Sequence, residues 1–340
     1  MRRRSTVTIL VGYRRGEEHA IDVIQQHPDG WLRHFAERGY PDVTPLAAGV
    51  EGVLYRLGDG QVAKVWKGRS AADLVAMQAV YRDVAAATPP FATPVVHRIE
   101  NVHGAVVTTE RELPGVSMPD TVDPDTYPTD ERATACVVEV LRGLATVPAT
   151  DAMRALAVLD ETQPFWAGHT TFTGALTALL GRRVTRFGDL LRARVPDFDG
   201  LYRALTDHLD AVAPVAPTII HGDLFPPNIL VDAEVRPLAA LDFGFFTTAG
   251  DPRFDAAVAA AIFAMYGPDS TAIRHALTGR VASALGYHGD HLRQYQAAYA
   301  VATAGLFAAD GSDGHTAWAV NLLNDPATRA ALREPGAVTP

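Results

Sequence analysis

The chain has 340 residues, of which 48% are hydrophobic and 20% are charged, and its formal net charge is −9. This length and composition describe an ordinary globular protein with room for two domains, each with its own core. Residues 1–115 carry a balance of +1 and residues 116–340 a balance of −10. The surplus of acids in the second half argues against a nucleic-acid partner, because nucleic acids require a basic surface.

No apolar run approaches the length of a membrane-spanning helix, so we expect no membrane partner. The basic residues at the start precede a short apolar run, 7–11, which is too short for the core of an export signal. A single cysteine, Cys136, excludes an intrachain disulfide and suits a reducing compartment. These features together predict a cytoplasmic protein.

Residues 1–40 are predicted to form an extension ahead of the main fold. Apolar residues have helical spacing at 17–25 and at 29–38, which predicts two helices. We expect this extension to pack on the β-rich segment that follows and to shield a strand edge there.

The segment 44–113 is rich in strand signals. Gly-Asp-Gly at 58–60 separates the apolar runs 46–57 and 61–67, and this pattern predicts a hairpin. Gly49 and Gly52 lie at the first turn of the segment, where backbone could approach bound phosphates.

Lys64 and Lys67 are the only two lysines in a chain that has 28 arginines. Strand alternation places Lys64 on one face of its strand and Ala63 and Val65 on the other. Lys67 is predicted to be a solvated residue at the strand end. An ordinary exposed strand lysine is the alternative interpretation of Lys64.

Helical and connecting segments occupy most of the remaining chain. A helix with an apolar stripe is predicted at 70–86, a strand at 105–115 and a Pro/Asp-rich connector at 116–130. A helix at 130–147, helical segments within 151–213 and a helical region at 253–334 follow. Trp166, His169 and Phe172 could line an acceptor pocket, but packing in the core is the favoured interpretation.

The polar loop His-Gly-Asp-Leu-Phe-Pro-Pro-Asn occupies 221–228, between two short apolar runs that predict strands. A third apolar run, 238–241, leads to Asp242. Asp223, Asn228 and Asp242 could each be an ordinary turn or strand-end residue. Together they match phosphoryl transfer, in which one carboxylate orients the attacking hydroxyl while an amide oxygen and a second carboxylate hold Mg²⁺.

These motifs, with Asp-Phe-Gly at 242–244 and Val-Ala-Lys-Val at 62–65, resemble the kinase-like small-molecule phosphotransferases. The resemblance is strongest to the aminoglycoside phosphotransferase and choline kinase group, and it covers about residues 44–310. It implies an α+β, two-lobed, protein-kinase-like fold with a nucleotide in the cleft between the lobes. The small nucleotide-binding lobe with its hinge would span 41–115, and the helical lobe with the catalytic loop and acceptor site would span 116–340.

The resemblance also implies a role for each site residue. Asp223 would be the catalytic base, Asn228 and Asp242 would bind Mg²⁺, and Lys64 would bind the phosphates of ATP or GTP. The remaining nucleotide-binding residues would be Gly49, Gly52, Glu110, Arg111, Glu112, Leu113 and Leu230, of which Glu110–Leu113 form the hinge. His221, Asp251 and Asp255 would support the loop or face the acceptor, and His221 is expected to anchor the loop rather than transfer protons. Asp251 also fits an ordinary helix cap.

One position departs from the family pattern. The helix after the lysine strand usually offers a glutamate to that lysine, but here the matching turn holds Met77 and Gln78. Three alternatives follow. Asp73 reaches the lysine from one turn earlier, or Lys64 is held differently, or the activity is poor.

The acceptor is predicted to be a small molecule, because Phe225 stands where protein kinases place a lysine and no long activation loop follows. The resemblance and the acidic second half favour a cationic antibiotic, such as an aminoglycoside or a basic peptide antibiotic, inactivated by phosphorylation. The alternatives are a macrolide, an endogenous alcohol of the choline or sugar type, and a nucleotide-binding pseudokinase. Asp310 and Asp313, in a Gly/Asp loop, could meet a cationic acceptor or form a solvated turn.

Overall fold

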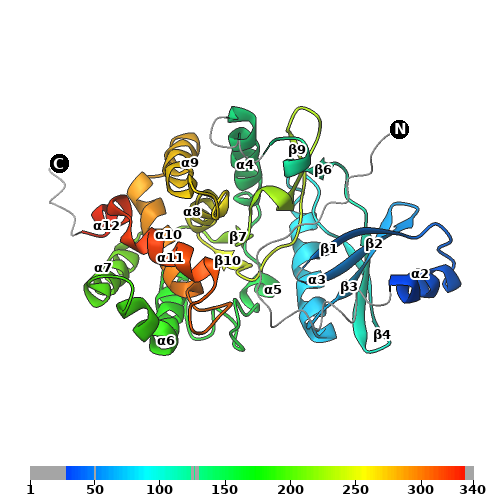
Figure 1. The fold of residues 1–340 in the computed structure, drawn as a ribbon, viewed down its shortest axis with the longest axis horizontal. Helices are drawn as coiled ribbons and strands as arrows, with labels where there is room; N and C mark the ends of the chain where they lie inside the picture. The colour runs from blue at the N-terminus through cyan, green and yellow to red at the C-terminus, as the bar shows by residue number, and fades with distance from the viewer. Residues whose placement is uncertain (1–27, 50, 124–125, 127–129, 334–340) are drawn as a thin grey trace. The chain divides into compact units, whose positions relative to one another are not determined.

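The computed structural model describes residues 28–49, 51–123, 126 and 130–333. These residues form two compact units. The first comprises the described residues up to Ala85 together with Thr93–Leu113, and the second comprises Ala86–Ala92 and the described residues from Pro114 onward. The expected α+β architecture is confirmed, with an antiparallel sheet in the first unit and mainly helices in the second (Figure 1). The helix predicted at 17–25 lies outside the described residues.

The first unit contains a five-stranded antiparallel sheet with the order β1-β2-β3-β5-β4. Its strands are β1 (Thr44–Gly49), β2 (Gly52–Gly58), β3 (Gln61–Trp66), β4 (Val96–Val102) and β5 (Ala105–Arg111). The hairpin predicted at 58–60 joins β2 to β3. The register pairs Lys64 with Leu54 on one side and with Thr108 on the other. Lys64 therefore lies on a central strand of the sheet.

One face of this sheet is buried under a helix. Ala63 and Val65 are fully buried and cluster with Tyr55 and with Phe35 of helix α2 (Pro28–Glu37). The rings of Phe35 and Tyr55 lie 5.5 Å apart. The helix predicted at 29–38 therefore exists, but it covers a face of the sheet rather than an edge. Because side chains alternate along a strand, Lys64 points to the opposite face.

Helix α3 (Ala71–Ala86) begins with a capping box. The Ser70 hydroxyl accepts from the Asp73 backbone N–H at 3.2 Å, and the Asp73 carboxylate accepts from the Ser70 backbone N–H at 3.2 Å. The Ser70 hydroxyl also donates to the same carboxylate, at 2.7 Å. This reciprocal pairing satisfies donors that a helix start leaves without intrahelical partners. Figure 1 shows α2 and α3 on opposite sides of the sheet.

Short strands in the second unit hold the polar loop. β7 (Thr218–Ile220) pairs with β10 (Thr248–Gly250), and β8 (Ile229–Val231) lies between β6 (Val116–Ser117) and β9 (Pro237–Ala240). Two single-turn helices, η1 (Met118–Asp120) and η3 (Pro226–Asn228), accompany them. The loop 221–228 therefore begins at the end of one small sheet and ends at the start of another.

Helices make up the rest of the second unit. They are α4 (Glu131–Leu144), α5 (Asp151–Arg154), α6 (Phe172–Arg192), α7 (Phe198–Ala211), α8 (Pro252–Ile262), α9 (Ser270–Leu285), α10 (Gly289–Thr303), α11 (Gly314–Asn324) and α12 (Pro326–Leu332). The centre of this unit is α10, in which every residue from Gln294 to Thr303 is buried. Trp166 and Phe172 are also buried, and the Trp166 indole donates to the Ala249 carbonyl at 2.9 Å, so the predicted packing role is confirmed for both.

No described helix combines the length and the apolar character that crossing a bilayer requires.

Candidate active site

Two glycines let the polar loop pack against the segment that follows β9. A Cβ atom on Gly222, whose φ is +74°, would lie 2.6 Å from the carbonyl carbon of Phe246. A Cβ atom on Gly244 would lie 2.3 Å from the Cβ of Asp223. Because real Cβ atoms do not approach so closely, glycine is required at both positions. The result places Asp223 directly against the Asp242–Gly244 segment.

The ring of His221 connects the same two segments. Its Nε2 lies 2.8 Å from the Leu241 carbonyl oxygen, and its Nδ1 accepts from the Asp223 backbone N–H at 3.3 Å. The side chain is fully buried, and burial lowers the pKa of His221 to about 4. The imidazole is therefore neutral near pH 7, with its proton on Nε2. With both nitrogens engaged in this way, the ring holds the loop in place.

Asp255 of α8 holds the loop through hydrogen bonds to its backbone. Its carboxylate accepts from the backbone N–H groups of His221, at 3.1 Å, and Gly222, at 2.9 Å. Burial raises the pKa of Asp255 to about 6, and the two backbone hydrogen bonds oppose that shift. The side chain is 2% exposed, so it faces the loop and not solvent.

Asp251 also points inward. It is the N-cap of α8, where it accepts from the Arg253 backbone N–H, and it forms an ion pair with the Arg253 guanidinium. The Tyr295 hydroxyl donates to the same carboxylate at 2.7 Å. With 4% of its surface exposed, Asp251 supports the helix start. The sequence left open whether Asp251 and Asp255 support the loop or face the acceptor, and the geometry of both residues matches support.

Asn228 and Asp242 are brought together by the backbone. The Asn228 amide nitrogen donates to the Asp223 carbonyl at 2.9 Å, and the Leu241 backbone N–H donates to the Asn228 carbonyl at 2.8 Å. Asp242 has a φ of +43°, a left-handed conformation that non-glycine residues seldom adopt and that concentrates at functional sites. The Asn228 amide oxygen and the exposed Asp242 carboxylate are hard oxygen donors, so this pair fits Mg²⁺.

Lys64 has a carboxylate partner that the sequence did not predict. Its Nζ lies 2.9 Å from Oε2 of Glu51, a residue of the turn between β1 and β2, and 3.8 Å from the centre of the Trp66 ring. The other oxygen of Glu51 pairs with Arg69 at 3.1 Å. Asp73 is engaged in the capping box of α3. Of the three alternatives, the one in which Asp73 reaches the lysine is therefore not observed, and the contact with Glu51 matches the alternative in which Lys64 is held differently.

The two glycines of the β1–β2 turn differ in their constraints. Gly52 has a φ of +150°, and a Cβ atom there would lie 2.0 Å from the Val65 carbonyl oxygen. A Cβ atom on Gly49 would meet nothing within 4 Å. Gly52 therefore allows the turn to lie directly on β3, whereas Gly49 is not sterically required.

The predicted hinge residues lie at the end of β5. The backbone N–H groups of Arg111 and Glu112 donate to the carbonyls of Val95, at 3.1 Å, and Gly60, at 2.7 Å. The Glu110 carboxylate accepts from the Thr108 hydroxyl at 2.6 Å, and Leu113 is the last residue of the first unit. Leu230, the remaining predicted nucleotide-binding residue, is half-buried in β8.

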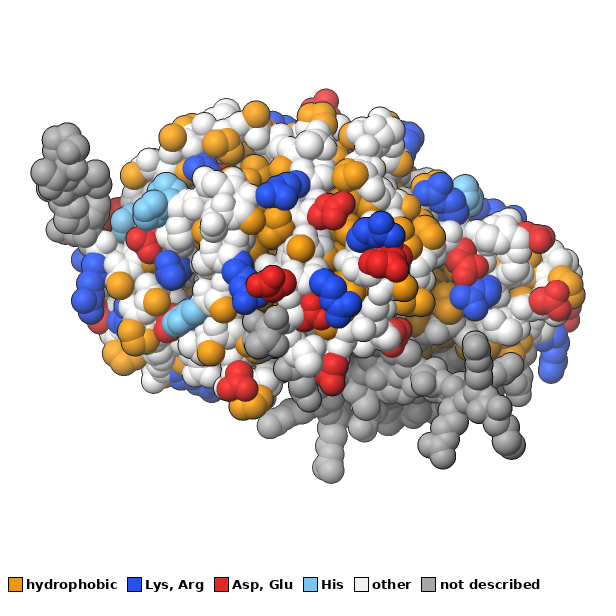
Figure 2. Space-filling model, turned by 90° about the horizontal axis from the view of Figure 1, so that it is seen from above, with side chains coloured by type: hydrophobic (Ala, Val, Ile, Leu, Met, Phe, Trp, Pro, Cys, Tyr) orange, Lys and Arg blue, Asp and Glu red, His pale blue; other side chains and the backbone are white. Residues whose placement is uncertain are grey.

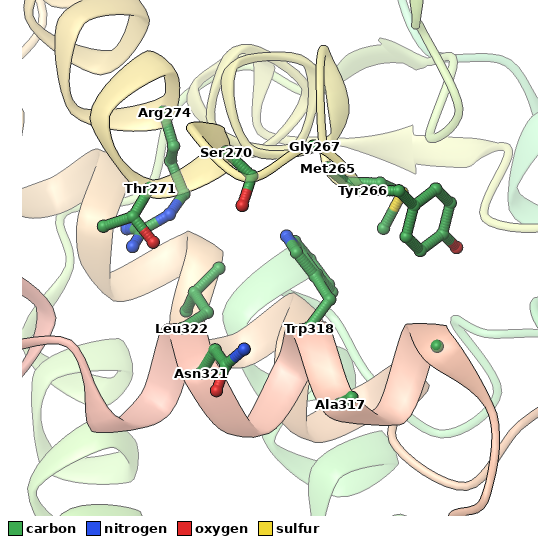
Figure 3. A pocket seen from close by; sticks show the side chains of 11 residues that line it. Met265, Tyr266, Gly267, Ser270, Thr271, Arg274, Ala317, Trp318, Asn321 and Leu322 are labelled. Atoms are coloured by element: carbon green, nitrogen blue, oxygen red, sulfur yellow. The ribbon is translucent and has the colours of Figure 1, made fainter.

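A cavity of about 270 Å³ lies between α9 and α11 in the second unit. Ser270, Trp318 and Asn321 direct polar atoms toward it (Figure 3). Arg274 is 4% exposed and pairs with Asp325 at 3.2 Å, and its Nη1 has no hydrogen-bond partner among the described residues. The full lining is Met265, Tyr266, Gly267, Ser270, Thr271, Arg274, Gly314, Ala317, Trp318, Asn321 and Leu322. It contains one cation and no carboxylate.

Tyr266 relates this cavity to the loop at 221–228. Burial raises the pKa of Tyr266 to about 12, with further contributions from the carboxylates of Asp313 and Asp223. The ring itself is 56% exposed, at the rim of the cavity. Asp313 itself caps α11, where it accepts from the backbone N–H and the hydroxyl of Thr316, both at 2.8 Å.

Sequence reasoning missed Glu51 and the residues around this cavity. A signal for Glu51 existed, because it stands between two glycines of the turn and the predicted hairpin folds that turn back along the lysine strand. The cavity residues come from α9, from α11 and from the segment just before α9, so no local pattern could identify them.

A family model described as the phosphotransferase enzyme family matches residues 42–299. Among solved structures, the GDP and kanamycin complex of APH(2")-IIia is 18% identical with a TM-score of 0.57, covering 88% of this chain and 98% of that one. The GDP complex of wild-type aminoglycoside 2'-phosphotransferase-IIIa is 15% identical with a TM-score of 0.54, covering 90% and 99%.

The aminoglycoside phosphotransferase APH(3'')-Id from Streptomyces rimosus, in complex with ADP and streptomycin, is 16% identical with a TM-score of 0.50, covering 87% of this chain and 98% of that one. No curated protein matches the chain significantly. At these identities the solved structures establish a shared fold, and the family model spans most of the chain. The chain therefore belongs to the phosphotransferase enzyme family.

Proposed function

We propose that this protein transfers the γ-phosphoryl group of ATP or GTP to a hydroxyl group of a small molecule in a Mg²⁺-dependent reaction. The observation that carries the proposal is the convergence of Asp223, Asn228 and Asp242. Gly244 packs on Asp223, and the backbone of Leu241 is bonded to Asn228. The neighbours crystallised with GDP or ADP support a nucleotide as the donor.

Each residue has a defined task in this reaction. Asp223 orients the acceptor hydroxyl and takes its proton as the new oxygen–phosphorus bond forms and the bond to the nucleoside diphosphate breaks. Asn228 and Asp242 would hold Mg²⁺, which would supply positive charge to neutralise the phosphates. Lys64 binds the phosphates as a compact positive charge. The protein contributes positioning and charge neutralisation, without a covalent intermediate.

For the acceptor, we propose a cationic antibiotic as the first candidate. The second half of the chain has a balance of −10, and the neighbours include complexes with kanamycin and streptomycin. However, acidic and basic side chains are interspersed on the face shown in Figure 2. The attraction of a cation would then depend on residues close to the site.

A neutral, hydroxyl-rich acceptor of the macrolide or sugar type is the second candidate. The cavity near Tyr266 favours it, because the lining residues include aromatic rings, neutral polar groups and the cation Arg274 but no carboxylate that would attract a positively charged acceptor. Such a lining binds uncharged rings through stacking and hydrogen bonds. The pseudokinase alternative rested on the missing helix glutamate, and Glu51 now provides a carboxylate at Lys64.

The proposal is tested with purified protein, Mg²⁺ and either ATP or GTP, against aminoglycosides, basic peptide antibiotics, macrolides, choline and sugars. Mass spectrometry of each acceptor detects an added phosphate. We expect one acceptor class to be modified and the reaction to stop when Mg²⁺ is chelated. Nucleotide binding without transfer to any member of this panel would count against the enzyme and favour the pseudokinase.

The Asp223→Asn variant tests the base directly. We expect its turnover to fall by about 10²–10⁴-fold, because general-base catalysis contributes factors of that size. The exposed Asp210 of α7 provides the control variant Asp210→Asn, which should keep full activity. If Asp223→Asn transfers phosphate as fast as the control, another group must act as the base.

A further inference from the structure

Glu51 bridges two cations on the first unit. One carboxylate oxygen lies 2.9 Å from Lys64 Nζ and the other 3.1 Å from Arg69 Nη2. Burial by itself would raise the pKa of the Glu51 carboxyl, but the pairing with these two cations lowers it. Lys64 is the more protected partner, with 13% of its side chain exposed against 41% for Glu51 and for Arg69.

The backbone holds Glu51 at this position. The Lys67 N–H donates to the Glu51 carbonyl at 2.8 Å, and the adjacent Gly52 lies so close to Val65 that no side chain fits there. The pairing between β2 and β3 continues this contact, because Gly52 is the partner of Trp66. The turn therefore lies on β3 through backbone contacts, and the carboxylate reaches the lysine from a fixed point.

Both acids of α3 are engaged in other contacts. Asp73 belongs to the capping box with Ser70, and Asp83 lies 3.6 Å from the Arg82 guanidinium. Gln78, at the turn where the resemblance predicted a glutamate, donates its side-chain amide to the Val96 carbonyl at 2.8 Å. These contacts stabilise the helix and its neighbouring strand.

We propose that Glu51 is the positioning residue of Lys64, and that it acts from the β1–β2 turn in place of a helix carboxylate. This inference rests on the proposed function, in which Lys64 binds phosphate. Glu51 contacts both cations through separate oxygens, Lys64 through Oε2 and Arg69 through Oε1, so one carboxylate of the turn holds the lysine and a second positive charge together.

This arrangement couples the lysine to the β1–β2 turn, whose backbone the sequence predicts to approach bound phosphates. A helix carboxylate would let helix movement control the lysine. Here the turn itself does so, because Glu51 is tied to β3 by both its backbone and its side chain. Displacement of the turn would remove the Glu51 carboxylate from the lysine.

A labelling experiment tests the pairing without any acceptor. Because the chain has only two lysines, partial acetylation followed by mass spectrometry gives the reactivity of Lys64 relative to Lys67 as an internal reference. We expect Glu51→Gln to raise this ratio several-fold, because the ammonium form loses its anionic partner. Glu51→Asp should give an intermediate ratio.

Glu100 supplies the matched control. Its carboxylate also bridges two arginines of the first unit, Arg38 at 2.8 Å and Arg98 at 3.3 Å. Glu100→Gln should leave the labelling ratio, the affinity for nucleotide and the activity unchanged. An equal rise of the ratio in both variants would mean a general loosening of the unit and would overturn the proposal.

Nucleotide binding and turnover provide the second readout. We expect Glu51→Gln to weaken Mg²⁺-nucleotide binding or lower kcat by about tenfold, and the double variant Glu51→Gln/Lys64→Ala to be no worse than Lys64→Ala alone. Such non-additivity is the mark of a residue that acts through another. Additive effects, or a Glu51→Gln variant identical to wild type in ratio, binding and turnover, overturn the inference.

The two proposals can fail separately. Transfer that depends on Asp223 but not on Glu51 overturns the positioning role and leaves the proposed function intact. A changed labelling ratio with weakened nucleotide binding, in a protein that phosphorylates no acceptor, supports the positioning role and overturns the proposed transfer alone.

Discussion

At the scale of single residues, glycines allow the segments of the site to approach one another closely, because glycine has no side chain. Gly244 lies against Asp223, Gly222 against Phe246, and Gly52 against Val65. In each case a methyl group would overlap an atom of the neighbouring segment. These contacts bring the Asp223 carboxylate against the 242–244 segment and the β1–β2 turn against β3, which a bulkier residue would not allow.

Substitution by alanine should affect stability very differently at the two glycines of the β1–β2 turn. Gly52→Ala should destabilise the first unit by about 2–4 kcal/mol, because the added Cβ meets the Val65 carbonyl and the backbone conformation disfavours an L-residue. Gly49→Ala meets no atom and should change stability by less than about 0.5 kcal/mol. Urea unfolding followed by tryptophan fluorescence measures both. Similar losses in the two variants would contradict the close approach of the turn to β3.

The contribution of an ion pair to stability depends on how deeply the pair is buried. The pair between Lys64 and Glu51 is partly exposed, so its direct contribution to stability is small, about 1 kcal/mol or less. Its importance in our proposal is orientation. The pair between Arg253 and Asp251 is mostly buried, and its loss would leave a buried charge without a partner.

At the scale of elements, helix N-caps show the same contrast. Asp251 caps α8 and also pairs with Arg253 and with the Tyr295 hydroxyl, whereas Asp313 caps α11 through contacts to Thr316. Both caps satisfy backbone donors at a helix start. Of these two caps, Asp251 alone also neutralises a largely buried guanidinium, that of Arg253.

We therefore expect Asp251→Ala to cost about 3–5 kcal/mol of unfolding free energy, because it strands the Arg253 charge and the Tyr295 hydroxyl. Asp313→Ala loses a cap alone and should cost about 1 kcal/mol. Chemical denaturation of the two variants and the wild type gives the comparison. Equal losses would show that the ion pair adds nothing beyond the cap.

Hydrophobic periodicity and turn chemistry were sufficient to predict most elements. The hairpin around 58–60, the helix from about 70 to 86 and the apolar runs that flank 221–228 all form as expected. These are local properties, since alternation, capping and turn residues act over a few positions. The predicted helix from 29 to 38 was correct, but its position over a face of the sheet depends on Phe35 finding partners far along the chain.

At the scale of the whole molecule, buried titratable groups link stability to pH. Burial lowers the pKa values of His221 and His315 to about 4 and raises that of Asp255 to about 6. A histidine with a lowered pKa makes its full contribution to the stability of the folded protein above the pKa of about 6.5 that it has in the unfolded chain. It loses that contribution as pH falls toward 4. Asp255, whose pKa is raised, acts in the opposite direction. Its contribution to the free energy of unfolding increases as pH falls from 6 toward the pKa that the carboxyl has in the unfolded chain.

Two histidines outweigh one carboxyl, so these three groups together should lower the free energy of unfolding by about 3 kcal/mol between pH 7 and pH 4. Ion-paired carboxyls with lowered pKa values, such as Asp160 and Asp325, act in the same direction as the histidines. His315→Phe removes one of the two histidines from an aromatic environment of Tyr299, Phe307 and Trp318, and should make this fall clearly smaller. Urea unfolding at a series of pH values tests this.

The exposed His97 provides the control, and His97→Phe should keep the wild-type slope. An unchanged slope in His315→Phe would contradict the assignment of that residue as a buried neutral base.

By itself the sequence determined the family, the α+β architecture and the residues that crowd the polar loop. Short motifs encode these, because Asp223, Asn228 and Asp242 stand at the ends of apolar runs that form small strands. Tertiary structure alone decided how those residues are supported. The bracing of the loop by Asp255, the pairing of Lys64 with Glu51 and the cavity beside Tyr266 join segments far apart in the chain. Contacts of that kind depend on how packed elements approach in space, and a local pattern carries no information about that distance.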